Sequence, residues 1–261
     1  MRQFFLTRLF SIFLSASVAL TSVVNAAPLS LFQEGNTGRS NPFFGLVQAH
    51  NLRLPNDMNP QKALSEIERR LYEQADFLSV LINAPILELK LPNSGRLQWL
   101  FILALAADGQ VVEAAVKLRT TKEQFPDEVL TAPALLARAM VARRSANLDA
   151  ARQLTESALR LAPQNPYAQN MLGMVATARG DLEIATEAFG QAAKLSPKAQ
   201  TYLLNLGVTD MNRDNAAGAN TALTAALLLA PNNCRALTAM AQLRARQLDL
   251  IAATLHMETC L

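Results

Sequence analysis

Pro163-Gln-Asn-Pro-Tyr-Ala-Gln-Asn-Met-Leu-Gly-Met-Val-Ala-Thr-Ala-Arg-Gly-Asp-Leu-Glu-Ile-Ala-Thr-Glu-Ala-Phe-Gly-Gln-Ala-Ala-Lys-Leu-Ser-Pro197 is the stretch that decides the fold of this chain. It runs 34 residues from one proline to another, and Pro231 follows after a further 34. Self-similarity at a period of this length is typical of repeat proteins, in which stacked helical hairpins bury one continuous core. The sequence therefore predicts an all-α solenoid.

Residues of similar size recur at this period. Antiparallel helices approach closely only where side chains are small, so columns of small residues mark the contacts of each hairpin. Larger side chains are expected to fill the space between hairpins. The small columns are Ala139, Gly173, Gly207, Ala241; Ala151, Ala185, Ala219, Ala253; and Ala158, Ala192, Ala226, Cys260, and the larger ones include Thr155, Phe189, Leu223, Met257 and Leu148, Leu182, Ala216, Leu250.

These units resemble the tetratricopeptide repeat. The best match is 166–197, through Leu172-Gly173, Gly180, Ala185, Phe189, Ala192 and Pro197. The resemblance covers 132–261 as four units, which are 132–163, 166–197, 200–231 and 234–261, and a degenerate unit is expected at 95–126. It implies a right-handed superhelical solenoid of helix-turn-helix hairpins that binds proteins rather than catalysing a reaction.

Residues 1–26 have the features of a secretory signal peptide. Arg2 and Arg8 precede a short apolar core, and Val24-Asn-Ala26 is a small-x-small cleavage site. An uncleaved membrane anchor is the alternative. After cleavage the sequence predicts an exported protein that is not inserted in the membrane, and the periplasm or envelope of a Gram-negative bacterium is the expected location.

The region between the signal and the array divides into two parts. Residues 27–59 contain turn-forming Gly, Asn, Ser and Pro, together with Phe43-Phe44, and are expected to form an extended arm or a flexible linker. Residues 60–131 are expected to be helical, with a first helix over 60–76 that begins at Asn59-Pro60. The run from Ile86 to Leu91 is expected to be a strand or a connector.

The composition and motifs argue against enzymatic and nucleic-acid-binding functions. The net charge is +3, or +1 without the two arginines of the signal, and no basic stripe is present. The two histidines, His50 and His256, have no partners at metal-ligand spacing. No nucleophile or nucleotide-binding motif occurs. We therefore expect no catalytic residues, no metal and no cofactor.

The two cysteines, Cys234 and Cys260, begin and end the last predicted hairpin. Antiparallel helices bring such ends together, and an exported protein can retain a disulfide. A disulfide between them is expected. The alternative is two small buried residues, because Cys260 occupies a column that otherwise holds alanine.

The first helix of each hairpin lines the concave surface in solenoids of this kind. The sequence predicts a groove there for an apolar helix or strand segment of a partner protein. The alternative is that some of these residues pack against the N-terminal arm. The predicted groove residues are Leu136, Met140, Arg143, Tyr167, Asn170, Met174, Leu204, Val208, Met211 and Asn212.

The last predicted hairpin is rich in apolar residues, which suggests a partner protein or self-association at the C-terminal end. In its repeat module and its export signal, the chain is similar to the exported accessory proteins of type IV and Tad (Flp) pilus assembly. This similarity implies a scaffold that assists a pilus or secretion machine. A periplasmic regulator or chaperone of cell-wall or polysaccharide-synthesis enzymes is the alternative function.

Overall fold

The computed structural model describes residues 53–55 and 57–260. The predicted signal peptide and nearly all of the predicted arm, including Phe43 and Phe44, lie outside the described residues. Within them the structure contains twelve α-helices, one 3-10 turn and no strand. The helices are α3 (Pro60–Gln74), α4 (Phe77–Lys90), α5 (Gly95–Ala107), α6 (Val111–Gln124), α7 (Ala132–Arg144), α8 (Leu148–Leu161), α9 (Pro166–Arg179), α10 (Leu182–Leu195), α11 (Gln200–Asn212), α12 (Ala216–Leu229), α13 (Cys234–Arg246) and α14 (Leu250–Cys260), with the turn η2 (Pro126–Glu128) between α6 and α7.

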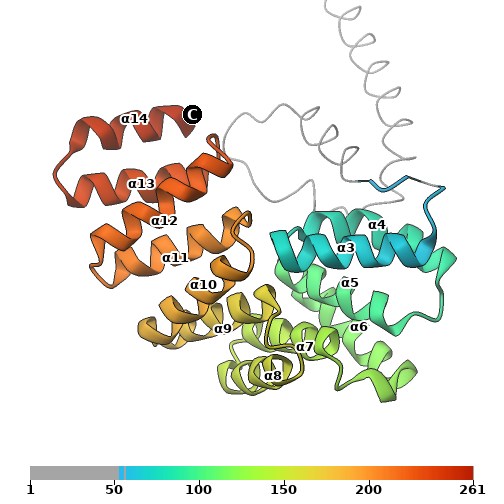
Figure 1. The fold of residues 1–261 in the computed structure, drawn as a ribbon. Coiled ribbons are helices and arrows are strands. Elements are labelled where there is room, and N and C mark those ends of the chain that lie inside the picture. Colours follow the sequence, from blue (N-terminus) through green and yellow to red (C-terminus); the bar gives the residue numbers. More distant parts are fainter. Residues whose placement is uncertain (1–52, 56, 261) are drawn as a thin grey trace, which may run out of the picture.

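Consecutive helices form hairpins that follow one another along a curve (Figure 1). The second helix of each hairpin from α7 onward packs on the first helix of the next, so α8 contacts α9, α10 contacts α11 and α12 contacts α13. This arrangement confirms the predicted all-α solenoid of helical hairpins.

Asparagine side chains begin many of the helices. The Oδ1 of Asn165 accepts hydrogen bonds from the backbone N–H groups of Tyr167 and Ala168, at 2.9 and 3.1 Å. These N–H groups have no partner inside the helix, so the side chain satisfies them. Asn59, Asn147, Asn215 and Asn233 cap their helices in the same way.

The turn inside each hairpin requires a left-handed backbone at one position. Gly180 has φ 85°, and the residues 34 positions before and after it, Ala146 and Asp214, have φ 59° and 57°. Leu248 continues the column with φ 61°. Only glycine adopts this conformation without a steric cost, so three of the four hairpins use a less favourable residue at this turn.

The small columns lie at close contacts within the hairpins. A Cβ atom on Gly173 would lie 2.5 Å from the ring of Phe189, and one on Gly207 would lie 2.7 Å from Cγ of Leu223. Both distances are far below van der Waals contact, so the larger residue of the second helix occupies the space that the glycine leaves. The predicted reason is therefore confirmed for the column that contains Gly173 and Gly207.

The N-terminal helices share one apolar core with the array. Buried side chains continue from Leu64 on α3 through Trp99 on α5 to Tyr202 on α11. A second cluster joins α11, α12 and α13 around Leu223 and Met240. Trp99 is fully buried, as expected for a core residue.

The prediction of a strand or connector over Ile86–Leu91 was wrong, because α4 is continuous from Phe77 to Lys90. It contains Pro85, which cannot donate a backbone hydrogen bond within a helix. Burial of Val80, Ala84 and Leu87 on one side of α4 accounts for the helical conformation despite this loss.

Candidate functional site

The structure buries most of the residues that the sequence assigns to a concave groove. Three are partly exposed, namely Arg143, Met174 and Val208, and Asn212 is exposed. The other six are 4% exposed or less, so they do not line an open groove: Leu136, Met140, Tyr167, Asn170, Leu204 and Met211.

Tyr167, at the centre of the predicted groove, is covered by the N-terminal helices. Its ring stacks on that of Tyr72 of α3 with the centroids 6.2 Å apart. The ring of Phe77, the first residue of α4, meets it edge-on at 5.6 Å. Aromatic pairs at these separations add to the stabilisation that burial provides.

Two hydroxyl groups of the array bind the C-terminal end of α3. Tyr202 Oη donates to the carbonyl of Tyr72 at 2.5 Å, and Ser196 Oγ donates to the carbonyl of Glu73. Both carbonyls belong to the last turn of α3, where backbone acceptors lack partners within the helix. The array therefore holds the end of α3 by contacts that span more than 120 residues of sequence.

We name this junction of Tyr72, Phe77, Tyr167, Ser196 and Tyr202 the clasp. The sequence offered the arm, with Phe43 and Phe44, as the segment that might pack on the groove. The arm lies almost entirely outside the described residues, and among the described residues α3 and the start of α4 pack on Tyr167 and α9. Sequence reasoning missed Tyr72, Ser196 and Tyr202, since no local pattern relates residues so far apart.

The clasp contains buried polar atoms without hydrogen-bond partners among the described residues. They are Oη of Tyr72, Oη of Tyr167 and, nearby on α7, Nε of Arg143. Burial raises the pKa of both tyrosines, and burial together with neighbouring Arg144 lowers the pKa of Arg143. Another nitrogen of Arg143 donates to Sδ of Met140 at 3.3 Å.

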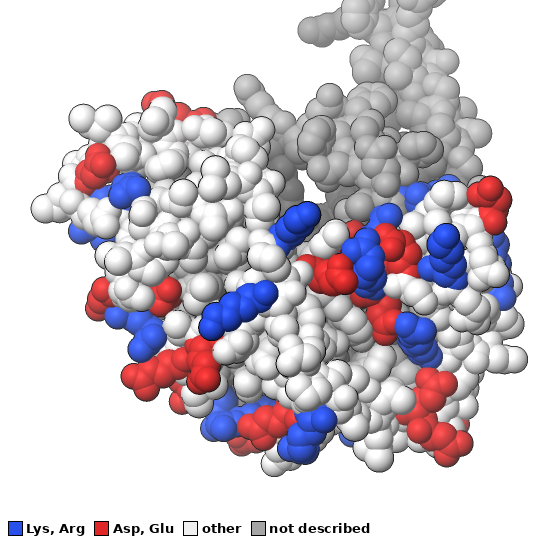
Figure 2. Space-filling view, in the orientation of Figure 1, with Lys and Arg blue, Asp and Glu red and all other residues white. Residues whose placement is uncertain are grey.

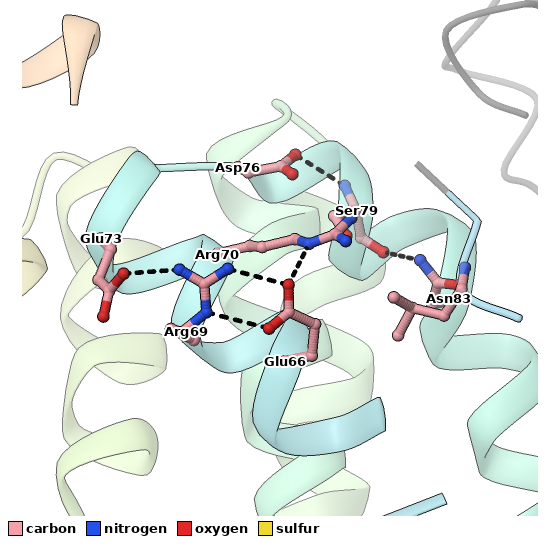
Figure 3. A network of polar contacts seen from close by, with 8 residues as sticks. Glu66, Arg69, Arg70, Glu73, Asp76, Ser79 and Asn83 are labelled. Atoms are coloured by element: carbon pink, nitrogen blue, oxygen red, sulfur yellow. Dashed lines mark hydrogen bonds and ion pairs between the residues drawn. The ribbon is translucent and has the colours of Figure 1, made fainter. Parts of the chain in front are cut away.

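The exposed side of α3 carries a network of ion pairs (Figure 3). Glu66 accepts from Arg69 at 2.9 Å and from Arg70 at 2.7 Å, and Arg69 also reaches Glu73 at 2.7 Å. Hydrogen bonds from the two arginines lower the pKa of Glu66 to about 2. This solvated network makes α3 amphipathic, with its apolar side in the core.

Four of the described residues beyond the clasp, at or beside positions of the predicted concave groove, are exposed or partly exposed. Met174 on α9 and Val208 on α11 occupy the same column of consecutive units and are partly exposed. Asn212 follows at the end of α11, and Arg246 of α13 donates to the carbonyl of Met211 at 2.6 Å. We name Met174, Val208, Asn212 and Arg246 the open concave half. It combines apolar side chains with polar ones at its edge.

The two best-formed pockets of the described residues are small. The two best-formed pockets have volumes of about 10 and 20 Å³, each on the order of a single water molecule. In the same part of the chain no group of three or more His, Cys, Asp or Glu residues could hold a metal ion. None of the helices from α3 to α14 is long and apolar enough to span a bilayer.

A disulfide joins Cys234 and Cys260, whose Cα atoms lie 4.9 Å apart. It links the first residue of α13 to the last residue of α14 and therefore closes the last hairpin at its open end. The alternative of two buried thiols does not hold in this structure.

Comparison with known proteins identifies structural neighbours and no sequence relatives. No family model and no curated protein matches the chain. Among solved structures, the chain is similar to pilF of Pseudomonas aeruginosa, with 22% identity and a TM-score of 0.55 over 64% of this chain and 75% of that one. It is also similar to a thermophilic TPR protein of Thermus thermophilus, with 17% identity and a TM-score of 0.55 over 64% of this chain and 90% of that one.

A third neighbour is a chain of the APC/C hetero-tetramer Cut9-Hcn1, with 20% identity and a TM-score of 0.59. The match covers 77% of this chain and 42% of that chain. At such identities the likeness establishes the fold alone. Together with the 34-residue columns and the stacked hairpins, it shows that the chain forms a tetratricopeptide-repeat solenoid.

Proposed function

We propose that this protein is a non-enzymatic scaffold that binds a segment of a partner protein on its open concave half. The observation that carries the proposal is the partial exposure of Met174 and Val208 on consecutive first helices, beside the exposed Asn212. Methionine adapts to irregular apolar surfaces, and such a strip suits an apolar helix or strand segment with polar groups at its edge.

The clasp supports this choice of surface. It covers Tyr167, at the centre of the predicted groove, with aromatic side chains of α3 and α4, which favours binding of a partner toward the C-terminal units. The two best-formed pockets, with volumes of about 10 and 20 Å³, are too small for a substrate, which favours a protein partner over a small substrate.

We further propose that the scaffold acts in the bacterial cell envelope, in assembly of a pilus or secretion machine. The signal-like segment 1–26 supports export. The similarity of the repeat array to pilus accessory proteins supports a role in assembling such a machine. The structural likeness to pilF is in keeping with this role. Fusion of residues 1–59 to alkaline phosphatase tests export. Enzyme activity in the periplasm is expected, and activity confined to the cytosol would contradict it.

Capture of partners from envelope extracts tests the binding surface. Wild-type protein is compared with the double variant Met174→Glu, Val208→Glu, which places two charges on the open concave half. The control is Val112→Glu, Val116→Glu on the exposed face of α6, where the wild-type residues are 80% and 54% exposed. Pilus or secretion components are expected with wild type and control, and at least about tenfold less of them with the concave variant, because truncating or charging a central contact costs at least this much.

Two outcomes would overturn parts of this proposal. Retention of the same components by the concave variant would exclude the open concave half as their binding site. Capture of cell-wall or polysaccharide-synthesis enzymes in place of pilus or secretion components would replace the assembly role by that of a periplasmic regulator or chaperone.

A further inference from the structure

Arg143 is the one partly exposed arginine of the described residues whose side chain has no oxygen acceptor. It lies in the last turn of α7. Its side chain makes one hydrogen bond, from Nη2 to Sδ of Met140 at 3.3 Å, and its Nε is buried without a partner. Most of the five N–H donors of this guanidinium are therefore unused, although an arginine side chain keeps its charge in proteins.

Every other partly exposed arginine in the described part of the chain donates to an oxygen atom at 2.7–2.9 Å. The pairs are Arg70 with Glu66, Arg138 with the carbonyl of Val129, Arg152 with Glu156 and Arg244 with Asn220. Figure 2 shows acidic and basic side chains interspersed over α3 and over α8 to α10. The lack of an oxygen partner thus distinguishes Arg143 from arginines of similar exposure.

Among the described residues, no carboxylate balances the charge of Arg143. Burial lowers its pKa, Arg144 lowers it further, and the opposing effect comes from the hydroxyl of Tyr167. Arg144 itself donates to the carbonyl of Ala107, the last residue of α5. A partly buried charge without a counterion is unfavourable, and a carboxylate that reached Arg143 would relieve this cost.

Arg143 lies at the α7 end of the column that continues into the open concave half. Met140, which accepts from its guanidinium, occupies the same column of the 34-residue period as Met174 and Val208. Helix α7 contacts α9, so the first helices of these two units are neighbours. Packed helices lie about 8–10 Å apart, a distance that about three residues of an extended chain span. A segment that covers Met174 and Val208 and follows this column therefore reaches Arg143.

A single guanidinium beside an apolar column suits a carboxylate within an apolar segment. The planar fork of arginine can form two parallel hydrogen bonds with one carboxylate. Nucleic acids are bound by stripes of basic residues, and the sequence has no such stripe. We propose that Arg143 binds an Asp or Glu side chain of the partner segment. The inference rests on the proposed function, because it assigns a chemical group to the same partner.

Selection from a phage library of random peptides on the purified protein tests this preference. Peptides that combine apolar residues with Asp or Glu are expected on the wild type. On Arg143→Gln the acidic residues should no longer be enriched, whereas the apolar residues should remain. The control Arg119→Gln removes the same charge from an exposed position of α6 and should select the same peptides as the wild type.

The size of the effect is measured with a selected peptide and its counterpart that carries Gln in place of the acidic residue. The wild type should bind the acidic peptide at least about tenfold more tightly, because a hydrogen bond to a charged group contributes about this much. Arg143→Gln should bind both peptides equally. Arg143→Lys keeps the charge but not the planar fork, so its ratio should lie in between. Titration calorimetry gives the affinities, and circular dichroism shows that the variants are folded.

The variant Met174→Ala, Val208→Ala separates this inference from the proposed function, because it removes apolar contacts without adding a charge. Peptides without acidic enrichment, or an acidic preference that Arg143→Gln retains, would overturn the inference. Loss of their binding to the double variant would then leave the proposed function intact. Peptides whose acidic preference depends on Arg143, but which bind the double variant as tightly as the wild type, would support the carboxylate site and contradict the open concave half. Selection of no peptide would overturn both.

Discussion

The central hairpin α9–α10 and the last hairpin α13–α14 are built from the same sequence columns, yet they differ in burial. In α10 the column residues Ala185, Phe189 and Ala192 are 3% exposed or less. The corresponding residues of α14, Ala253, Met257 and Cys260, are partly or largely exposed. The difference shows that a repeat position is buried by its neighbour as much as by its own hairpin.

The two hairpins also hold their helices together by different means. In the central hairpin the ring of Phe189 fits against the bare backbone of Gly173. In the last hairpin the equivalent pair is Ala241 and Met257, and a disulfide supplements it. Helix α10 packs against a helix on each side. Helix α14 has no described helix on its outer side, and a covalent link holds it to α13.

The largest effect is expected when the side chain that both hairpins carry in the same column, Phe189 in one and Met257 in the other, is truncated to alanine. Phe189→Ala should lower the free energy of unfolding by about 3–5 kcal/mol, because it leaves a cavity beside Gly173. Met257→Ala should cost under about 1 kcal/mol in dilute protein, because its side chain is 43% exposed. Urea denaturation of both variants measures the difference. Equal losses would show that burial does not distinguish the two hairpins.

Removal of the disulfide should affect the last hairpin alone. Cys234→Ser, Cys260→Ser is expected to lower the local stability of α13–α14 by about 3 kcal/mol. The reason is that the disulfide closes a loop between residues 26 positions apart, which restricts the unfolded chain. Hydrogen exchange should show faster exchange in α14 and unchanged rates in α9 and α10. Reduction of the wild-type protein serves as the matched comparison. Uniformly faster exchange along the array would contradict a local role.

Two glycine variants of the central hairpin should change stability in opposite directions. Gly173→Ala should destabilise it by about 1–2 kcal/mol, because the new Cβ would lie 2.5 Å from the Phe189 ring. Gly190→Ala on α10 has open space around it and should stabilise by about 0.5–1 kcal/mol through its helix propensity. Thermal unfolding of the pair measures both. Stabilisation by Gly173→Ala would refute the close contact.

The smallest effects are expected at the left-handed turn position. Gly180→Ala should lower stability by about 1 kcal/mol, since alanine is strained at φ 85°. Leu248→Gly should raise it by about 0.5 kcal/mol, because it relieves the strain of leucine at φ 61° in the last hairpin. Both are measured by urea denaturation of the purified protein. The same sign for both changes would contradict this reading of the turn.

The repeat period predicted much of the fold because it reports contacts between residues near in sequence. The pairing of Gly173 with Phe189 and of Cys234 with Cys260 both lie within one hairpin. Of the left-handed turn residues, the sequence pointed only to Gly180. Ala146, Asp214 and Leu248 were missed, since they adopt a left-handed backbone that glycine adopts more readily. Helix α4 was misjudged at Pro85, where burial outweighs the local preference.

The candidate site depended on contacts that no period records. Tyr167 was correctly assigned to a first helix, but its burial under Tyr72 and Phe77 joins segments 90 or more residues apart. Sequence columns describe the array as if every unit had equal neighbours. The N-terminal helices and the last hairpin are where that description fails.

By itself the sequence determined the helical hairpins, their 34-residue period, the small residues where helices meet and the cysteines at the two ends of the last hairpin. Each follows from local helix geometry and side-chain size. Only the tertiary structure decided which residues of the predicted groove stay exposed and which helix has no described helix packed on its outer side. Those properties depend on how distant segments fold back on the array, and the free energy of such contacts arises only when the segments meet.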